Sequence, residues 1–377
     1  MGLDNFVLLS RGRRVVLYFQ LLIISKSGIA CAVPSTKEIL IEKYADVFGE
    51  ENVKKFSKMT GIFSRYTTIQ EQTASDLSYE AAKHLINKKN IQLATIGAIV
   101  FVTQTPDYRL PSSACVLHKR LNLSKDCMAF DVNLGCSGYV YGLQILSSLM
   151  ASSNIERGLL LAGDTLTKSC APKDSSSCML FGDAGSATLL ERTDEKRCIQ
   201  MGFRTDGNRF KAIIIPAGAY RNSDSPHERV LWGDGNVRSD YDLYMNGTDV
   251  FTFTITEVPL LISEFMDKTN TKPDNYDSFV MHQANLFILK QVAKRCKISM
   301  DKMLISMDRY GNTSVTSIPL TMADKYGDNN YGSSKMLMSG FGIGLSWGAV
   351  SAEVDTRDIY SILETDSFFK EGSVSRD

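Results

Sequence analysis

Short apolar runs alternate along the first half of the chain with segments whose apolar residues recur every three or four positions. Residues 96–103 and 128–134 are apolar runs of strand length, whereas residues 75–88 and 137–150 carry large apolar side chains at helical spacing. An alternation of strands and helices is typical of layered α/β proteins. We therefore predict an α/β fold in which the strand at residues 128–134 leads directly into a helix.

The first seventy residues follow this pattern less regularly. Residues 15–24 form an apolar run that predicts a first buried strand. Residues 35–44 predict a helix, and residues 57–68 predict a loop that leads into an extended segment. Residues 1–13 match no element.

The second half of the chain repeats the pattern of the first after a polar, glycine-rich interval at residues 205–248. Residues 249–268 predict a long helix despite an internal proline, and the alternation then resumes. A strand at Phe101, a helix and a glycine turn at Cys136 correspond to a strand at Phe279, a helix and a glycine turn at Asn312. We therefore predict a duplicated α/β unit, with one half at residues 1–205 and the other at residues 206–377.

Composition excludes several classes of function. Lys and Arg number 42 and Asp and Glu also number 42 among 377 residues, so no bulk charge indicates binding to nucleic acid or to a membrane surface. The eight cysteines include no C-x-x-C pair and no zinc spacing, so we expect reduced thiols and no metal site. No apolar stretch approaches the length of a membrane span.

The N-terminal segment resembles a secretory signal, because basic residues 11–14 precede the apolar run at residues 15–24. The same run also fits a first buried strand. A chain that depends on a thiolate gains nothing from an oxidising compartment. We therefore favour the strand and expect the protein to be cytoplasmic.

Cys136 lies at the change from strand to helical periodicity and is flanked by Gly135 and Gly138. Free backbone N–H groups at a helix N-terminus favour an anion, so this position predicts a lowered thiol pKa and a reactive thiolate. The flanking glycines would allow a substrate to approach backbone amides that stabilise an oxyanion. The alternative is a small buried cysteine without a chemical role.

His282 and Asn312 end the corresponding segments of the second half. Ligands in such sheets gather at the carboxyl ends of the strands, where Cys136, His282 and Asn312 would converge. Alone, His282 could be a strand-end residue bonded to backbone, and Asn312 could be a helix cap or turn residue. Together, a thiolate and two neutral donors are sufficient to form a thioester and stabilise a carbonyl oxyanion.

Four motifs in order resemble β-ketoacyl-acyl-carrier-protein synthase III of the thiolase-like superfamily, in its Cys-His-Asn branch. They begin at Leu134, His282, Tyr310 and Phe341 and read LGCSG, HQAN, YGNTS and FGIGLSWG. The resemblance extends over nearly all of residues 22–354. It implies a thiolase-like fold of duplicated α/β units in a five-layered αβαβα arrangement.

The resemblance also implies the chemistry and the site. Cys136 would carry an acyl group, and His282 and Asn312 would promote decarboxylation of a malonyl carrier-protein thioester, whose carbanion attacks the acyl-cysteine. This is the Claisen condensation of fatty acid or polyketide-type biosynthesis, catalysed by an acyltransferase. The resemblance places oxyanion amides at Gly344 and Leu345 and implies a homodimer, an acyl carrier protein as partner, acyl-CoA or acyl-carrier substrates and no permanently bound cofactor.

Other positions of the resemblance concern substrate binding. A substrate pocket would be formed by Leu110, Phe341 and Ile343, with Leu110 in the place of the aromatic residue that caps the partner subunit's pocket. A carrier-protein surface would be formed by Lys290, Lys294 and Arg295, although a solvated helix face explains the same cluster.

This sequence departs from the family pattern at positions that contact the donor. Lys55, Met59 and Ser175 occupy places where family members that use CoA have an aromatic residue and arginines, and Phe287 replaces an arginine that binds the carrier. We therefore expect no aromatic platform and no arginine clamp for the CoA nucleotide, and a donor other than acetyl-CoA.

Two further functions fit part of the pattern. One is acyl transfer to an oxygen, nitrogen or sulfur acceptor without condensation, which release of carbon dioxide would distinguish. The other is a catalytically silent partner subunit, against which the intact Cys136, His282 and Asn312 argue. A papain-like protease also uses Cys, His and Asn, but a duplicated sheet does not suit it.

Overall fold

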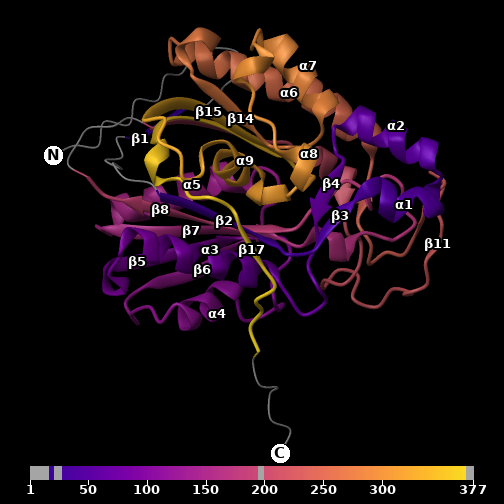
Figure 1. Ribbon diagram of the computed structural model, residues 1–377, viewed down its shortest axis with the longest axis horizontal. Coiled ribbons are helices and arrows are strands. Elements are labelled where there is room, and N and C mark those ends of the chain that lie inside the picture. The colour runs from indigo at the N-terminus through magenta and orange to yellow at the C-terminus, as the bar shows by residue number, and fades with distance from the viewer. Residues whose placement is uncertain (1–16, 21–27, 194–198, 371–377) are drawn as a thin grey trace, which may run out of the picture.

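The fold consists of two β-sheets that lie face to face, with helices between them and on both outer faces (Figure 1). The computed structural model describes residues 17–20, 28–193 and 199–370. From one outer face to the other, the layers are helices, sheet, helices, sheet and helices. The expected five-layered αβαβα arrangement is confirmed.

The first sheet has six strands in the order β17-β2-β8-β7-β5-β6. Its strands β5 and β7 are almost wholly buried, because helices cover both faces of the sheet. This explains why their sequences are continuous apolar runs. In chain order the strands are β2 (Gly28–Pro34), β5 (Ile96–Val102), β6 (Met128–Val132), β7 (Arg157–Asp164), β8 (Ala184–Glu191) and β17 (Leu363–Thr365).

The second sheet has five strands in the order β1-β9-β16-β15-β14. Strands β15 and β16 form a long antiparallel pair, and β14 joins β15 in parallel. In chain order the strands are β1 (Leu17–Gln20), β9 (Ile199–Thr205), β14 (Ser278–Met281), β15 (Ser333–Gly342) and β16 (Ser346–Asp355).

The two sheets have the same pairing pattern. Along β2-β8-β7-β5-β6, two antiparallel pairs are followed by two parallel pairs. Along β9-β16-β15-β14, two antiparallel pairs are followed by a parallel pair, and a parallel bridge from Phe279 to Met303 takes the place of the last strand. This correspondence confirms the predicted duplication.

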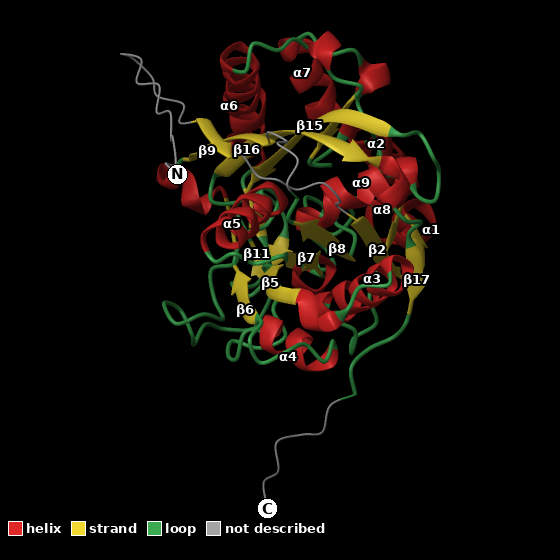
Figure 2. Ribbon diagram, turned by 90° about the vertical axis from the view of Figure 1, so that its left-hand side faces the viewer, coloured by secondary structure: helices red, strands yellow, loops and turns green. Residues whose placement is uncertain are grey.

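Helices occupy the three remaining layers. Helices α3 and α4 cover the outer face of the first sheet, α5 and α9 lie between the sheets, and α6 and α7 cover the second sheet (Figures 1 and 2). Glycine at position 142 lets α5 approach the first sheet, because a Cβ there would lie 2.6 Å from Leu160 Cδ1. The helices are α3 (Ala74–Lys89), α4 (Ser113–Arg120), α5 (Gly138–Ser152), α6 (Gly247–Lys268), α7 (Leu286–Cys296) and α9 (Ser317–Tyr326).

Smaller elements flank the layers at the side where the strands end. Among them, α2 was not predicted, and the helix predicted at residues 35–44 begins only at Leu40, because residues 37–39 pair as a strand. The elements are β3 (Lys37–Ile39), α1 (Leu40–Phe48), α2 (Glu50–Thr60), β4 (Ser64–Tyr66), α8 (Met307–Tyr310) and the 3₁₀ turns η1 (Leu93–Thr95), η2 (Leu166–Ser169), η3 (Gly207–Ala212), η4 (Pro273–Asn275), η5 (Met300–Lys302), η6 (Ser314–Thr316) and η7 (Thr356–Asp358).

The polar interval at residues 205–248 folds around one buried guanidinium. Arg238 is fully buried, lies 3.0 Å from Asp174 and packs against the rings of Trp232 and Tyr244, which stack on each other. The interval therefore has a fixed structure despite its composition. It contains β10 (Ile213–Ile214), β11 (Val230–Leu231), β12 (Val237–Arg238) and β13 (Tyr244–Met245).

The predicted boundary after residue 205 does not coincide with the two sheets. Strand β9 precedes the boundary but belongs to the second sheet, and β17 near the C-terminus belongs to the first. The first half of the chain therefore contributes β1 and β9 to the second sheet, and the second half contributes β17 to the first sheet.

Of the apolar run predicted as a first buried strand, only residues 17–20 are described. They form β1 at the edge of the second sheet, paired antiparallel with β9. The rest of that run and residues 1–13 lie outside the described residues. Within the described ranges, no helix combines the length and hydropathy needed to cross a membrane.

Candidate active site

The three predicted chemical side chains lie at the ends of corresponding segments of the two halves. Cys136 lies between β6 and α5, His282 directly follows β14, and Asn312 follows α8. All three are buried, with 6%, 2% and 4% of their surfaces exposed. A site built from them is therefore enclosed by protein.

Strand β15 links Cys136 to His282. The ring of Phe341 meets the His282 ring edge to face at a centroid distance of 5.5 Å. At the next residue, a Cβ on Gly342 would lie 2.8 Å from the Cys136 Sγ atom. Adjacent residues of β15 therefore contact His282 and Cys136.

Glycine is required where other segments meet Cys136. A Cβ on Gly340 would lie 2.9 Å from the Cys136 carbonyl oxygen, and one on Gly135 would lie 2.0 Å from the Gln104 Oε1 atom. The glycine motifs of the sequence thus permit close packing of the end of β15 against the turn that carries the thiol.

Burial raises the pKa of the Cys136 thiol to about 12. The Ile343 backbone, the Ser314 side chain and the Cys136 backbone oppose this shift, whereas the charge of Asp164 adds to it. The expected lowering of the thiol pKa by the helix N-terminus is therefore wrong for the enclosed site, because desolvation of a thiolate outweighs a few amide donors. The resting side chain is a thiol.

The other cysteines differ in their environments. Burial raises the pKa of Cys127 to about 11 and those of Cys170 and Cys178 to about 12, so these thiols, like that of Cys136, are protonated at neutral pH. Cys115 is exposed on α4. Its position gives no reason for special reactivity. It differs from Cys136 in being exposed, whereas Cys136 is buried.

His282 is a neutral imidazole at physiological pH. Burial lowers its pKa to about 3, and a backbone contact with Ser314 opposes this only in part. Its Nδ1 atom lies 2.8 Å from the Ser317 hydroxyl at the start of α9. When that hydroxyl donates to Nδ1, the proton of the ring is on Nε2, which can then donate to a substrate oxygen.

Two hydrogen bonds, one from the N–H and one to the carbonyl, hold the backbone of Asn312 in place. Its N–H donates to the Leu180 carbonyl at 2.9 Å, and its carbonyl accepts from the Gly182 N–H at 3.0 Å. The side-chain Oδ1 accepts from the Ser314 N–H at 3.0 Å. Since Oδ1 is occupied, Nδ2 is the end of the amide that can donate to a substrate.

One of the two expected oxyanion amides is engaged elsewhere. The Leu345 N–H donates to the Asp206 carbonyl at 3.2 Å, so the prediction for Leu345 is wrong. The backbone of Ile343, which was predicted as a pocket residue, is instead the amide contact of the Cys136 thiol. The prediction for Gly344 stays a prediction.

The predicted pocket residues lie in different environments. Phe341 is buried against His282, and the side chain of Ile343 lies over the Gly135 turn. Leu110 is 74% exposed. Within one chain, Leu110 therefore belongs to the molecular surface and not to the enclosed site.

The three residues expected to contact the donor line one surface groove of about 340 Å³. Lys55 and Met59 come from α2, whereas Ser175 follows β7, where its N–H and hydroxyl donate to Asn236 Oδ1 at 3.0 Å. No arginine lines the groove, but Phe48 and Phe56 do. Helices α1 and α2 thus supply aromatic side chains to the groove from other positions, and the expectation that positions 55, 59 and 175 form no aromatic platform stays a prediction.

The predicted basic surface lies on α7. Lys290, Lys294 and Arg295 are exposed, and none forms an ion pair within the described part of the chain. On the same helix Phe287 is 45% exposed and stacks on Phe251 at a centroid distance of 5.6 Å. The helix therefore presents three cations and the exposed ring of Phe287, which stacks on the partly buried Phe251 of α6.

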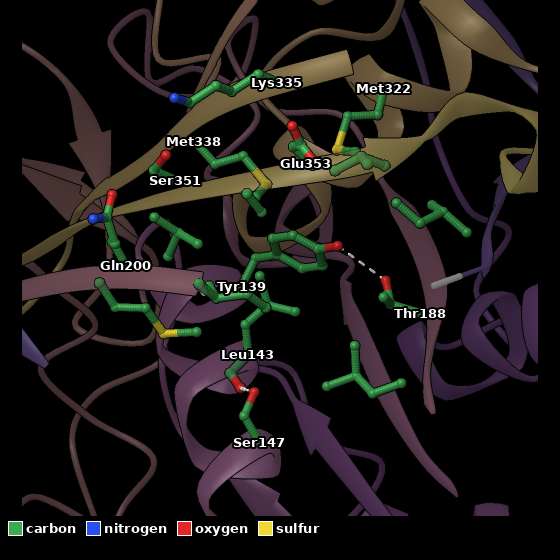
Figure 3. Close-up of a pocket in the computed structure, with 17 residues that line it drawn as sticks. Tyr139, Leu143, Ser147, Thr188, Gln200, Met322, Lys335, Met338, Ser351 and Glu353 are labelled. Atoms are coloured by element: carbon green, nitrogen blue, oxygen red, sulfur yellow. Dashed lines mark hydrogen bonds between the residues drawn. The ribbon is translucent and has the colours of Figure 1, made fainter. Parts of the chain in front are cut away.

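A separate cavity of about 380 Å³ lies beside α5 (Figure 3). The Tyr139 hydroxyl forms a 3.0 Å hydrogen bond with Thr188 in this cavity, and methionines supply part of its wall. None of Cys136, His282 and Asn312 lines it. No local pattern in the sequence indicates this cavity, because its wall combines residues of seven separate elements.

Comparison with known proteins gives one consistent result. A family model described as 3-oxoacyl-[acyl-carrier-protein (ACP)] synthase III matches residues 130–207, and the model of the C-terminal part of that family matches residues 266–354. The putative 3-oxoacyl-[acyl-carrier-protein] synthase 3 of Campylobacter jejuni is 33% identical over 341 residues, which are 89% of this chain and 94% of the relative.

Two further relatives agree. The beta-ketoacyl-[acyl-carrier-protein] synthase III of Clostridium perfringens is 35% identical over 294 residues, which are 77% of this chain and 87% of the relative. A crystal structure of 3-oxoacyl-(acyl-carrier protein) synthase from Burkholderia xenovorans LB400 matches with a TM-score of 0.87 at 34% identity, covering 93% of this chain and 99% of the other.

Proposed function

This chain belongs to the 3-oxoacyl-[acyl-carrier-protein] synthase III family, and from that premise we propose how its own residues carry out acyl transfer and decarboxylative condensation. Cys136 is the acyl acceptor, and His282 and Asn312 are the donors that activate the malonyl thioester. The contact of Phe341 and Gly342 with His282 and Cys136 carries this assignment.

The first step transfers the acyl group to Cys136. The sulfur of Cys136 attacks the carbonyl carbon of the donor thioester as the thiol gives up its proton, which finally reaches the donor thiolate that leaves. The backbone amide of Ile343, which contacts the thiol, is the nearest donor for the oxyanion that forms. The bond from carbon to the donor sulfur then breaks, and the released thiolate takes up a proton. A Cys136 thioester and a free thiol result.

The second step forms the carbon–carbon bond. His282 Nε2 and Asn312 Nδ2 donate hydrogen bonds to the thioester oxygen of a malonyl carrier, so that loss of carbon dioxide leaves an enolate with its charge on that oxygen. The enolate carbon attacks the acyl carbonyl, and the Cys136 sulfur leaves. A neutral imidazole suits this role, because the low pKa of His282 keeps the ring from becoming charged.

Intact-protein mass spectrometry tests the first step. We expect the wild-type protein to gain one acyl mass when incubated with acyl-CoA or acyl-carrier thioesters of several chain lengths. Cys136→Ala should gain none, whereas Cys127→Ala is a matched control that should still be acylated, since Cys127 is a buried thiol outside the site. A stoichiometric adduct on Cys136→Ala would contradict the assignment.

Release of labelled carbon dioxide from malonyl-carrier tests the second step. His282→Ala and Asn312→Ala should lower this release by about 10²–10³ while sparing acylation, because removal of one oxyanion donor typically costs that much. Wild-type release in both variants would contradict the proposed roles. Acylation of the wild type without any release of carbon dioxide would instead indicate transfer without condensation.

The donor is proposed to be an acyl chain on a carrier protein. The groove of Lys55, Met59 and Ser175 contains no arginine that could bind the CoA phosphates bidentately. The free cations of α7 offer a surface for an acidic carrier. The kcat/KM values for matched acyl-CoA and acyl-carrier pairs test this, and equal values would contradict it.

A homodimer in the cytoplasm is proposed for the assembly. Leu110 is largely exposed, and β6 has an unpaired edge at the side of the first sheet, where a second copy could pair. Light scattering after size-exclusion chromatography tests the dimer. A cytoplasmic location is supported by the thiol chemistry, and fractionation of cells tests it.

A further inference from the structure

Ser314, which has no part in the mechanism above, contacts all three side chains of the site. Its N–H donates to Asn312 Oδ1 at 3.0 Å, and its backbone is a hydrogen-bonding partner of the His282 ring. Its hydroxyl is close to the Cys136 thiol. One residue at the start of η6 thus joins the nucleophile to both donors.

The backbone of Ser314 is left-handed, with a φ of 48°. A residue with a Cβ is strained in this region, and strained residues of this kind concentrate at functional sites. Glycine would remove the strain. A serine at this position therefore indicates that its hydroxyl contributes something that glycine would lose.

The hydroxyl of Ser314 is fully buried and has no hydrogen-bond partner of regular geometry among the described residues. The same is true of Oδ2 of Asp164, a fully buried carboxyl at the end of β7 that lies within reach of Ser314. Two buried polar atoms without a fixed partner are unusual. Here they are neighbours, and Cys136 is the third member of the group.

The other oxygen of Asp164 is fixed firmly. Oδ1 accepts from the Gln104 N–H at 2.7 Å and from the Thr103 and Thr105 hydroxyls at 3.2 and 3.3 Å. These contacts hold the carboxyl in place, and the backbone of Val315 and the side chain of Ser314 are further contacts of the group. Burial raises the pKa of Asp164 to about 6, so the group is mostly ionised at neutral pH.

We propose that the Ser314 hydroxyl is shared between Oδ2 of Asp164 and the sulfur of Cys136, and that it donates its hydrogen bond to the sulfur once the thiolate forms. No covalent bond changes in this rotation. The hydrogen bond favours the thiolate, and the Asp164 charge opposes it. Ser314 is therefore a further catalytic residue, and Asp164 is a group that competes with the sulfur for its hydroxyl.

The rate at which iodoacetamide alkylates Cys136, followed by peptide mass spectrometry from pH 6 to pH 10, tests this inference. Ser314→Ala removes the hydroxyl, and Ser314→Gly removes it while also relieving the backbone strain. Asp164→Asn keeps an oxygen for Gln104, Thr103 and Thr105 but removes the charge. Ser186→Ala is the matched control, because the Ser186 hydroxyl is equally buried but donates to the Ala162 carbonyl.

Both Ser314 variants should be alkylated about 10-fold more slowly than the wild type at pH 7, with the pH profile shifted upward, since a hydrogen bond to a charged group is worth at least this much. Asp164→Asn should be alkylated faster, with its profile shifted downward, and Ser186→Ala should match the wild type. Thermal melting verifies that each variant is folded.

Wild-type alkylation in a folded Ser314→Gly protein would overturn the proposal, and slower alkylation of Asp164→Asn would overturn the part assigned to Asp164. The inference rests on the proposed function only in taking Cys136 as the nucleophile. Alkylation needs no acyl substrate. If the wild type forms no acyl adduct but the alkylation rates differ as described, the proposed function fails and this inference stands.

Discussion

Cys136 and Gly342 are in contact without room for another atom, so the residue opposite the sulfur can only be glycine. A Cβ at position 342 would lie 2.6 Å from the Cys136 Cβ and 2.8 Å from its Sγ. Gly342→Ala should therefore displace the thiol and lower the rate of acylation by about 10²-fold, the usual effect of a 1 Å error in a reacting group.

Gly233→Ala provides the matched control for this prediction, because a Cβ at position 233 would meet no atom within 4 Å. Single-turnover acylation measured by mass spectrometry compares the two variants. The predicted contact is wrong if a folded Gly342→Ala protein is acylated at the rate of Gly233→Ala.

His282 should make the protein less stable in acid. Its pKa of about 3 in the folded state is below the value of 6.5 in the unfolded chain, so the unfolded state binds the proton first. The contribution of His282 to the free energy of unfolding is fully present above pH 6.5 and is lost as the pH falls toward 3. The free energy of unfolding should lose about 2 kcal/mol from this group between pH 8 and pH 5.

His282→Gln isolates this effect, because glutamine has no proton to gain. Asp164 has the opposite dependence, since its raised pKa of about 6 means that the folded state gains a proton first as the pH falls. Urea unfolding at pH 5 and pH 8 therefore measures the loss of unfolding free energy for the wild type and for His282→Gln. The difference between the two losses is the contribution of His282. An equal loss in wild type and variant would contradict the prediction.

At the scale of one element, helix α7 begins close to His282 and carries the proposed carrier surface on its outer face. Its N-cap Asn285 accepts from the Ile288 N–H at 2.8 Å, which fixes the start of the helix three residues after His282. Its outer face carries Lys290, Lys294 and Arg295. The site and the proposed carrier surface are thus joined by one rigid helix.

Replacing Lys290, Lys294 and Arg295 together by glutamine should raise KM for an acyl-carrier donor several-fold and leave the KM for the matching acyl-CoA unchanged. Attraction between exposed charges is screened over roughly 10 Å at 0.1 M salt, so the effect should shrink as salt is added. Lys83→Gln with Lys88→Gln on α3 is a control on an outer helix of the other sheet. An identical change for both donors would refute a carrier surface on α7.

At the scale of the whole molecule, the two halves are interlocked. Strand β9 extends the second sheet from the first half of the chain, and β17 extends the first sheet from the second half. The central helices α5 and α9 each contact both sheets. Neither half can therefore bury its core alone.

We accordingly predict that the protein unfolds in one transition, with equal calorimetric and van't Hoff enthalpies. Fragments 1–205 and 206–377, expressed separately, should be unfolded, and the first should also lack β17 beside β2. A fragment with native-like amide dispersion in its NMR spectrum would show instead that the halves are independent domains.

The fold class was accessible from the sequence because strand and helix periodicities are local. Strand β6 and helix α5 lie where the change of period at Cys136 placed them. Helix α2 was missed, because its buried side is formed by Val53, Ser57 and Thr60, of which only Val53 is apolar. That omission also hid Phe56, which supplies an aromatic wall of the groove.

The sequence by itself determined the duplicated α/β pattern and led to the proposal of Cys136, His282 and Asn312 as the chemical side chains, because spacing in two repeated units shows which residues occupy corresponding places. Only the tertiary structure decided the protonation state of the site, since the pKa of Cys136 depends on burial by β15 and on the Asp164 charge. It also decided which amide is free, because the partner of Leu345 is Asp206, far away in the chain. Local patterns specify elements, whereas desolvation and hydrogen-bond partners depend on which distant elements pack together.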